Sequence, residues 1–285
     1  MSFILSPFQK KAVEGIEQNK HVLITAHTGS GKTLPAEHAI NFFTKQGKKV
    51  IYTSPIKALS NQKFSDFSKK FNTIEVGILT GDNKHNPEAD LLIMTTEILH
   101  NQLFRLNSKE SLKSHLDFSM DIENDLACVI FDEVHYINDN DRGTIWEQTM
   151  MLLPNNVQFV MLSATIGNPE YLTNWISDIK DRETIICGTN ERVVPLFFYT
   201  YYTCSDKSIN ELKDKNHKKL LYSKCNELHK IENNVLQETT QCMNILKNIH
   251  IHRKYVINEL CKKMRENEMF PALFFVFSRI QVEEI

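Results

Sequence analysis

The segment AHTGSGKT (26–33) constrains the fold more than any other part of the chain. It follows the apolar run HVLIT (21–25) and opens an amphipathic stretch, Lys32–Gln46, that stops before Gly47. A glycine-rich turn that leads from a strand into a helix and ends in Gly-Lys-Thr is the context of a phosphate-binding loop. Glycine lets backbone N–H groups turn toward phosphate oxygens, and the helix N-terminus adds partial positive charge.

Each residue of this loop has an expected role. Lys32 is expected to bridge the outer phosphates of a nucleotide, and the Thr33 hydroxyl to hold Mg²⁺. Ala26 stands where the strict pattern has its first glycine, so a plain glycine-rich turn is the alternative interpretation. The predicted nucleotide-binding residues of the loop are Thr28, Gly29, Ser30, Gly31, Lys32 and Thr33.

Short apolar runs alternate with longer amphipathic stretches from Val22 to about Cys187. Several runs are continuously apolar, which is typical of strands buried on both faces of a sheet. Strands that alternate with helices predict an α/β fold with a mostly parallel sheet and helices on both faces. The runs predicted to be strands are residues 21–25, 49–54, 74–80, 90–96, 127–132, 157–165 and 183–188.

The run ACVIFDEVH (127–135) ends in two carboxylates. In a parallel sheet, that strand end lies at the same edge as the phosphate loop. Asp132 is expected to hold Mg²⁺ through water, and Glu133 to polarise the attacking water as a general base. His135 lies further round the turn and is expected to couple the catalytic site to nearby polar groups. An isolated Asp-Glu pair is usually a solvated strand end, and the phosphate loop upstream is what favours catalysis here.

Taken in order, these motifs resemble those of superfamily-two DExH helicases, specifically the superkiller and exosome-associated RNA helicase family with its DEVH box. The stretch 132–154 is especially similar to that family. The resemblance covers about residues 3–202 and 271–285 and is weak across 203–270. It implies a RecA-like P-loop NTPase domain with ATP and Mg²⁺ as cofactors. It also implies an ATP-dependent RNA helicase that couples hydrolysis to 3′-to-5′ translocation and unwinding.

The segment FILSPFQKKAV (3–13) resembles the adenine-recognition segment of the family. The resemblance implies that Phe3 stacks on adenine and that Gln9 hydrogen-bonds its edge. A side-chain amide suits this role because it has both a donor and an acceptor. A hydrophobic helix start with an exposed glutamine is the alternative interpretation of this segment.

The segments 53–63, 79–82 and 94–99 resemble nucleic-acid-contact motifs of the family. Hydroxyl and amide groups at strand ends suit contacts to the sugar-phosphate backbone, which carry no sequence information. Taken singly, each segment is also compatible with ordinary loop polarity. The implied nucleic-acid-binding residues are Thr53, Pro55, Lys57, Asn61, Gln62, Thr95, Thr96 and Glu97. The resemblance implies that a further segment couples nucleotide state to nucleic-acid grip, namely Ser163, Ala164 and Thr165.

The chain is predicted to divide into three parts. Residues 1–188 form a first RecA-like domain, 189–268 a linker and helical connector without a compact core, and 269–285 the start of a second RecA-like domain. Its opening strand is predicted at 271–278, and the polar region 104–126 is predicted to be a surface insertion. The intact protein is expected to be longer, because the strand and half helix at 271–285 cannot bury themselves. The motifs of the second domain, including its arginine finger, are absent from this sequence.

Bulk composition restricts the partners only weakly. A net charge of −2 and a pI near 6.6 give no overall basic signature, so any nucleic-acid track has to be local. No apolar run approaches the roughly 20 residues that span a membrane, and the N-terminus does not read as a signal peptide. Six cysteines without a C-x-x-C pair disfavour disulfides and a zinc site and favour reduced intracellular thiols.

The expected partner is single-stranded or tailed duplex RNA, and the resemblance implies an association with RNA-decay machinery. The expected location is the cytoplasm or nucleus, or the virion if the source is a virus. A DNA helicase or translocase of the same superfamily is one alternative, because backbone contacts do not identify the sugar. A non-catalytic RNA-binding scaffold is another, although intact Lys32, Thr33, Asp132 and Glu133 argue against it.

Overall fold

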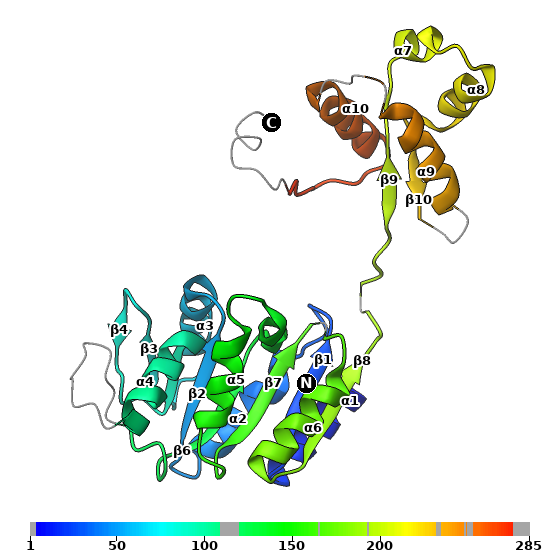
Figure 1. Ribbon diagram of the computed structural model, residues 1–285. Coiled ribbons are helices and arrows are strands. Elements are labelled where there is room, and N and C mark those ends of the chain that lie inside the picture. The colour runs from blue at the N-terminus through cyan, green and yellow to red at the C-terminus, as the bar shows by residue number, and fades with distance from the viewer. Residues whose placement is uncertain are drawn as a thin grey trace. The chain divides into compact units, whose positions relative to one another are not determined.

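The chain forms two compact units, Met1–Val194 and Pro195–Ile285, which are described separately. In the first unit, helices cover both faces of a sheet, so the unit has three layers (Figure 1). The computed structural model describes residues 4–108, 120–164, 166–192, 194–231, 235–247, 249 and 253–275.

The described residues of the first unit contain an eight-stranded sheet with the order β4-β3-β5-β2-β6-β7-β1-β8. All neighbouring strands pair in parallel except β3 and β4, which pair antiparallel. Every predicted run overlaps one of the strands, so the predicted mostly parallel sheet is confirmed. The strands are β1 (His21–Ala26), β2 (Lys49–Ser54), β3 (Val76–Leu79), β4 (Lys84–His85), β5 (Leu91–Thr95), β6 (Leu126–Phe131), β7 (Gln158–Ser163) and β8 (Thr184–Thr189).

Two apolar clusters fill the space between the sheet and its helices. In β1, Leu23 belongs to one cluster while Val22 and Ile24 belong to the other. Alternate side chains of a strand point to opposite faces, and both faces here are covered, so the run is continuously apolar. The helices of this unit are α1 (Pro7–Glu17), α2 (Thr33–Thr44), α3 (Lys57–Lys70), α4 (Thr96–Ser108), η1 (Val134–Asn138), α5 (Gly143–Leu152) and α6 (Pro169–Lys180).

The helix that follows the phosphate loop ends close to its predicted stop. Helix α2 ends at Thr44, and the Gly47 N–H donates to the Thr44 carbonyl oxygen at 3.0 Å. Gly47 has φ +71°, a left-handed conformation that glycine adopts without steric cost. The glycine therefore turns the chain out of α2 and into β2.

The prediction of a surface insertion at 104–126 is wrong at both ends. Helix α4 continues to Ser108, and Met120, Ile122 and Leu126 are buried in the core. Residues 109–119 lie outside the described residues. Most residues of this region are polar, but the apolar residues spaced among them pack in the core.

The second unit has a small core of its own. The expectation that the connector lacks a compact core is wrong, because apolar residues far apart in sequence converge once the helices fold back. These buried residues are Tyr202, Cys204, Ile209, Leu221, Cys225 and Cys242. The elements of the unit are β9 (Tyr199–Tyr201), α7 (Asp206–Glu211), α8 (Lys215–Lys224), β10 (Leu228–Lys230), α9 (Val235–Leu246) and α10 (Arg253–Glu266), with β9 and β10 paired antiparallel.

The strand predicted at 271–278 is not formed in its described part. Residues 271–275 have no strand structure, and Leu273 and Phe275 are each 85% exposed. A strand needs a neighbour that accepts and donates its backbone hydrogen bonds, and no described strand pairs with this segment. Residues 276–278 lie outside the described residues.

Two further features concern the chain as a whole. The six cysteines are free thiols, five of them buried. In the part of the chain that the structure describes, no helix is both long enough and apolar enough to cross a membrane.

Candidate functional site

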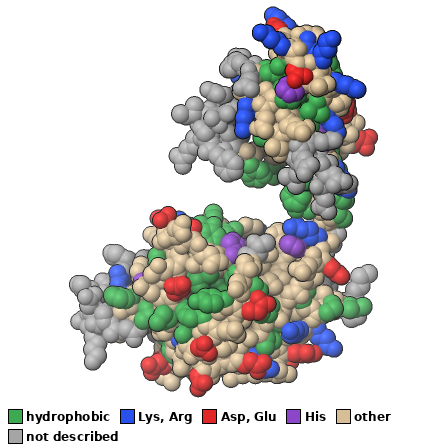
Figure 2. Space-filling view, turned by 45° about the vertical axis from the view of Figure 1, so that its right-hand side comes forward, with side chains coloured by type: hydrophobic (Ala, Val, Ile, Leu, Met, Phe, Trp, Pro, Cys, Tyr) green, Lys and Arg blue, Asp and Glu red, His purple; other side chains and the backbone are tan. Residues whose placement is uncertain are grey.

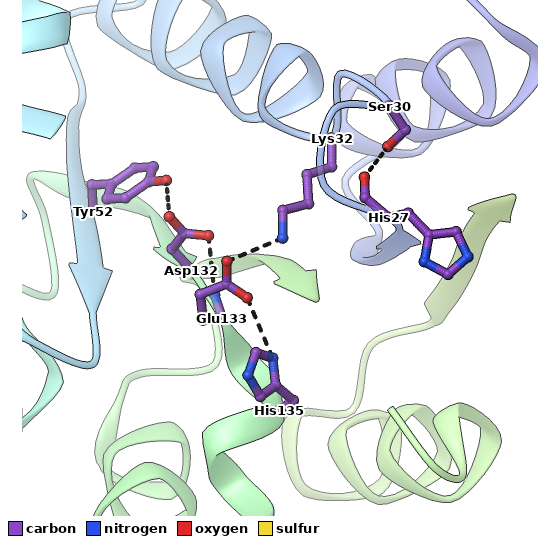
Figure 3. A network of polar contacts seen from close by, with 7 residues as sticks. All are labelled: His27, Ser30, Lys32, Tyr52, Asp132, Glu133 and His135. Carbon is purple, nitrogen blue, oxygen red and sulfur yellow. Dashed lines mark hydrogen bonds and ion pairs between the residues drawn. The ribbon is translucent and has the colours of Figure 1, made fainter. Parts of the chain in front are cut away.

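The phosphate loop lies between β1 and α2, beside the carboxylates that follow β6 (Figure 3). Gly29 and Gly31 have φ values of +86° and +82°, which L-residues with a side chain rarely adopt. The Ser30 hydroxyl donates to the His27 carbonyl oxygen at 2.6 Å, which closes the turn from inside. The path of the loop therefore depends on its two glycines.

An ion pair joins the loop to the end of β6, and a histidine lies on its far side. Lys32 Nζ lies 3.1 Å from Glu133 Oε1, and Glu133 Oε2 lies 3.3 Å from His135 Nδ1 (Figure 3). Lys32 is only 9% exposed and the Glu133 side chain 25%, so this pair is partly shielded from bulk water. A phosphate that entered the loop would compete with Glu133 for the lysine.

Asp132 is buried, and both of its carboxylate oxygens accept hydrogen bonds. The Tyr52 hydroxyl donates to Oδ2 at 2.6 Å, and the Glu133 N–H donates to Oδ1 at 3.0 Å. Burial raises the pKa of Asp132, and the bond from Tyr52 acts against that rise. Burial and the neighbouring Asp132 charge raise the pKa of Tyr52 well above its usual value, so Tyr52 stays protonated and remains a donor.

The backbone of Glu133 is left-handed, with φ 55° and ψ 45°. For a residue with a side chain this costs about 1–2 kcal/mol. The conformation turns the chain from β6 into η1 and allows the Glu133 carboxylate to reach Lys32. Such strain at a strand end is typical of functional sites, where the surrounding packing maintains it.

Gln9 ties the start of α1 to the phosphate loop. Its Oε1 accepts from the Ser6 N–H at 2.9 Å, and its Nε2 donates to the Gly31 carbonyl oxygen at 3.0 Å. Phe3, the predicted stacking residue, lies outside the described residues. A pocket of about 400 Å³ borders the loop here, lined by Ser6, Pro7, Phe8, Ser30, Gly188, Thr189, Glu191 and Arg192.

A second pocket, of about 420 Å³, brings together four of the predicted nucleic-acid-binding residues. Its lining residues are Pro55, Ile56, Lys57, Gly81, Thr95, Glu97, Ile98 and Arg142. Arg142 Nη1 donates to the Pro55 carbonyl oxygen at 3.2 Å, and Lys57 Nζ donates to Asp82 Oδ2 at 2.6 Å. Two exposed cations and a threonine therefore meet where β2 and β5 end, which is a geometry that suits a phosphate backbone.

Burial argues against two of the predicted contacts. Thr53 and Thr96 have no exposed surface, and the Thr53 hydroxyl donates inward to the Ile130 carbonyl oxygen at 3.2 Å. In this conformation neither hydroxyl can touch a bound strand. Asn61 and Gln62 are exposed on α3, and their predicted contacts remain open.

The segment predicted to couple nucleotide state to nucleic-acid binding, residues 163–165, begins between the phosphate loop and the acidic pair. Ser163 ends β7 and is paired in register with Thr25, the penultimate residue of β1. Strand β7 lies between β1 and β6, so Ser163 is flanked by the strands that lead to the phosphate loop and to Asp132. Ala164 follows half-buried, and Thr165 lies outside the described residues. The coupling role itself stays a prediction.

Two residues of this region are not identified by the sequence motifs. Tyr52 carries the one hydroxyl group in the apolar part of the run KVIYTS. A polar group in a run predicted to be buried is the sequence signal that could have identified it. Arg142 lies eleven positions after Phe131, the last residue of β6, and nothing in its local pattern points to the pocket at Pro55. Tertiary contacts alone identify Arg142.

Comparison with known proteins places these features in a family. The chain matches the DEAD/DEAH box helicase family over residues 6–172. It is 46% identical over 194 residues to antiviral helicase SKI2 of Saccharomyces cerevisiae, across 68% of this chain and 14% of that protein. It is 42% identical over 199 residues to human exosome RNA helicase MTR4, across 70% of this chain and 18% of that protein.

A longer alignment relates the chain to an uncharacterized helicase of Schizosaccharomyces pombe. The two are 36% identical over 289 residues, across 99% of this chain and 25% of that protein. The chain thus spans a quarter or less of the length of these relatives. A solved structure of DUF1998 helicase MrfA bound to DNA superposes with a TM-score of 0.52 at 19% identity, across 65% of this chain and 27% of that one. At that identity the likeness shows the fold alone.

The family match covers more than half of the 285 residues. It includes the phosphate loop, the Asp132-Glu133 pair and the pocket at the ends of β2 and β5. The resemblance to DExH helicases is therefore confirmed, and this chain belongs to the DEAD/DEAH box helicase family.

Proposed function

We propose that this chain is the ATP-binding part of an ATP-dependent RNA helicase. The observation that carries the proposal is the 3.1 Å contact between Lys32 and Glu133, which joins the phosphate loop to the acidic pair across 101 residues of sequence. A cation for the outer phosphates and a carboxylate for the attacking water then share one site. The relatives named SKI2 and MTR4 are described as helicases, which supports the same reading.

The residues present fit ATP and Mg²⁺. An added Cβ at Gly29 would meet nothing within 4 Å, so the backbone of the loop is open on that side. Thr33 at the start of α2 and Asp132 supply the oxygen ligands that Mg²⁺ prefers. Bound Mg²⁺ would neutralise part of the phosphate charge. The pocket that borders Ser30 is the proposed place for the base, with Gln9 beside it.

The role proposed for Glu133 is that of general base, with Lys32 Nζ 3.1 Å from one carboxylate oxygen and His135 Nδ1 3.3 Å from the other. With Lys32 moved onto a phosphate, Glu133 Oε1 becomes free to accept a proton from water. His135 then positions the carboxylate through Oε2.

RNA is the proposed nucleic acid, with 3′-to-5′ translocation and unwinding as the proposed activity of the whole protein. The relatives named exosome RNA helicase and superkiller complex protein motivate both RNA and a role with RNA-decay machinery. The proposed binding face is the pocket lined by Lys57, Thr95, Glu97 and Arg142. The proposed location is intracellular, in the cytoplasm or nucleus.

We retain the three-part division as part of this proposal. The end of β8 at Thr189 supports a first RecA-like domain over about 1–188. The proposed connector is 189–268 and the proposed second RecA-like domain begins at 269; the alignment with the S. pombe helicase covers 99% of this chain and therefore includes both segments. Since that second domain would provide the arginine finger, worth on the order of 10³–10⁵ in rate, we expect the 285-residue chain alone to bind ATP weakly and hydrolyse it slowly.

The decisive test is Glu133→Gln in the intact protein. ATPase activity should be abolished while ATP binding is retained, because the amide keeps the size of the side chain but cannot accept the proton. Asp181→Asn is a matched control, since Asp181 is another acidic residue with a left-handed backbone (φ 47°) and it follows α6 outside the site. ATP turnover that survives in Glu133→Gln would disprove the catalytic assignment.

The choice between RNA and DNA needs a separate measurement. ATPase activity of the intact protein is measured with single strands of RNA and of DNA of the same sequence. Greater stimulation by RNA is expected. Equal or greater stimulation by DNA would favour the DNA helicase alternative, and strong RNA-stimulated turnover by the 285-residue chain alone would contradict the proposed need for a second domain.

A further inference from the structure

In the second unit, two helices are inserted into a β-hairpin. Strands β9 and β10 pair antiparallel, and α7 and α8 lie between them in sequence. The base of this excursion is closed, because the Asn226 N–H donates to the Tyr202 carbonyl oxygen at 3.0 Å and the Thr203 hydroxyl bonds the Asn226 side chain. We call residues 203–226 the helical insert. The DEAD/DEAH family match ends at residue 172 and does not include it.

A cleft of about 500 Å³ lies between the helical insert and α9. Its lining residues are Leu212, Asn216, His217, Leu220, Gln241, Asn244 and Ile245. Three of these are aliphatic and three carry side-chain amides. The amides of Asn216, Gln241 and Asn244 are exposed, and none has a hydrogen-bond partner among the residues that the structure describes.

This lining matches the chemistry of a nucleobase. A base has two apolar faces, which fit an aliphatic surface, and an edge of alternating donors and acceptors. A side-chain amide carries both a donor and an acceptor and can therefore pair with any base edge. The cleft thus offers a surface for the face of a base and exposed amides for its edge.

The helical insert is also basic, unlike the chain as a whole. It contains six lysines against three acidic residues, a net charge of +3, whereas the chain has −2. Figure 2 shows basic side chains gathered at the end of this unit where Figure 1 places α7 and α8. The insert is therefore a local basic region within a chain whose net charge is slightly negative.

Two of its lysines directly precede residues that line the cleft. Lys215 and Lys219 are one turn apart on α8, on the row next to Asn216 and Leu220. Both are exposed, and neither has an ion-pair partner within the described ranges. The nearest acidic group in sequence, Asp214, accepts the backbone N–H groups of residues 216 and 217 as the N-cap of α8. Its Oδ1 therefore faces the helix end, and its Oδ2 lies 3.8 Å from His217 Nε2.

We propose that the helical insert and α9 form a second binding site for single-stranded RNA, separate from the pocket at the ends of β2 and β5. One base occupies the cleft against Leu220, and the flanking phosphates bind Lys215 and Lys219. The site rests on the proposed function, in that RNA is the substrate of the whole protein. A duplex does not fit this chemistry, because its bases are stacked and paired and present no free face.

The test measures binding of the 285-residue chain to a labelled single-stranded RNA of about 12 nucleotides, a length within the site sizes of single-strand binders. Fluorescence anisotropy is recorded over a series of salt concentrations. Each phosphate contact on a single strand contributes about 0.7 to the slope of log affinity against log salt. Lys215→Ala/Lys219→Ala should therefore lower the magnitude of that slope by about 1.4 and weaken binding at low salt.

Lys45→Ala/Lys69→Ala is the matched control. It removes two lysines of the first unit that have no ion-pair partner in the described part of the chain. Its slope should equal that of the unaltered chain. An unchanged slope in Lys215→Ala/Lys219→Ala, or an equal drop in the control, overturns the proposed phosphate contacts.

A second measurement locates the base. RNA that carries 5-iodouracil is crosslinked by light, and the modified peptides are identified by mass spectrometry. Crosslinks are expected within α8 or α9, and Asn244→Asp, which adds a negative charge at the cleft, should reduce them. Crosslinks confined to residues 53–99 would disprove this second site and leave the helicase proposal standing.

The same assays distinguish the second RNA site from the helicase proposal, and they distinguish RNA from DNA as the ligand. Binding by this site needs no ATP hydrolysis, so the anisotropy is measured without ATP. If the unaltered chain does not bind RNA, the second site is overturned. The ATPase activity of the intact protein tests the helicase proposal independently. Tighter binding of a DNA strand of the same sequence overturns the choice of RNA.

Discussion

The Tyr52 hydroxyl, on β2, donates a 2.6 Å hydrogen bond to Asp132 Oδ2 at the end of β6. The two residues are 80 positions apart in sequence, and both are buried. The phenol fixes one oxygen of the carboxylate that is proposed to hold Mg²⁺, and the Glu133 N–H fixes the other. A carboxylate oxygen has two lone pairs, so each retains one for water or metal. Tyr52 thereby orients Asp132 rather than replacing a ligand.

Tyr52→Phe should weaken the Mg²⁺-dependent part of nucleotide binding. The variant keeps the ring in the core but removes a hydrogen bond to a charged group, which is worth about 1.5–3 kcal/mol, or roughly tenfold or more in affinity. Calorimetric titration of ATP with and without Mg²⁺ measures the difference. Tyr171→Phe is the control, since Tyr171 is 74% exposed. A Mg²⁺ dependence that is the same in all three proteins would refute the positioning role.

Gly31→Ala should destabilise the phosphate loop and abolish nucleotide binding. Gly31 has φ +82°, and an added Cβ would lie 2.6 Å from Gln9 Nε2. The left-handed backbone alone costs about 1–2 kcal/mol with a side chain, and the contact with Gln9 adds to it. The loss is measured by chemical unfolding and by ATP titration.

Gly29→Ala separates the two causes. Gly29 has φ +86°, but an added Cβ there meets nothing within 4 Å, so only backbone strain remains. Its loss of stability should be smaller than that of Gly31→Ala, and Gln9→Ala combined with Gly31→Ala should recover part of the difference. Equal losses in the two glycine variants would show that the Gln9 contact is irrelevant.

Lys57 and Asp82 should have opposite effects on RNA binding. Lys57 Nζ is paired with Asp82 Oδ2, and both side chains are more than half exposed. Lys57→Ala should reduce the magnitude of the salt slope of RNA binding by about 0.7, one phosphate contact. Asp82→Asn removes the competing anion and should tighten binding modestly. Binding isotherms over a salt series test both, and weaker binding of Asp82→Asn would contradict the assignment.

His21 should make stability fall under mild acid. Burial, and then the charges of Arg182 and Lys180, lower the pKa of His21 from 6.5 to about 3. Neutral His21 also accepts the Phe159 N–H at 2.8 Å through Nδ1, a bond that protonation would break. Below pH 6.5 the unfolded chain binds a proton here that the folded chain does not, so stability is full at higher pH and decreases as pH falls toward 3.

This linkage amounts to about 1.4 kcal/mol between pH 7.5 and 5.5. His21→Asn keeps an acceptor but cannot titrate, so its stability should change less with pH by that amount. Chemical unfolding followed by tryptophan fluorescence reports the relevant unit, because Trp146 and Trp175 both lie in the first unit. Identical pH dependence in the variant and the unaltered protein would mean that His21 is protonated in the folded state.

Local pattern was sufficient for much of the first unit. The strands at 21–26 and 49–54 were predictable from continuous apolar runs. In a strand buried on both faces, the side chains of both faces are apolar, so the whole run is apolar. Lys32 and Glu133 were identifiable because each lies in a short motif at a strand end. Their 3.1 Å contact follows from a parallel sheet, which brings such strand ends to one edge.

Contacts between distant segments were beyond any local pattern. Arg142 reaches the Pro55 carbonyl oxygen across 87 positions, and the burial of Thr53 depends on which strands flank β2. In the second unit, Leu221 and Cys242 meet only after α8 folds back on α9.

The sequence by itself determined the phosphate loop, the acidic pair and the alternation of strands and helices, because each depends on neighbouring residues alone. The tertiary structure decided the bond from Tyr52 to Asp132, the place of Arg142 and the cleft beside Lys215. The physical reason is that hydrogen bonds and burial depend on distance in space, and strand order and helix packing set that distance for residues far apart in the chain.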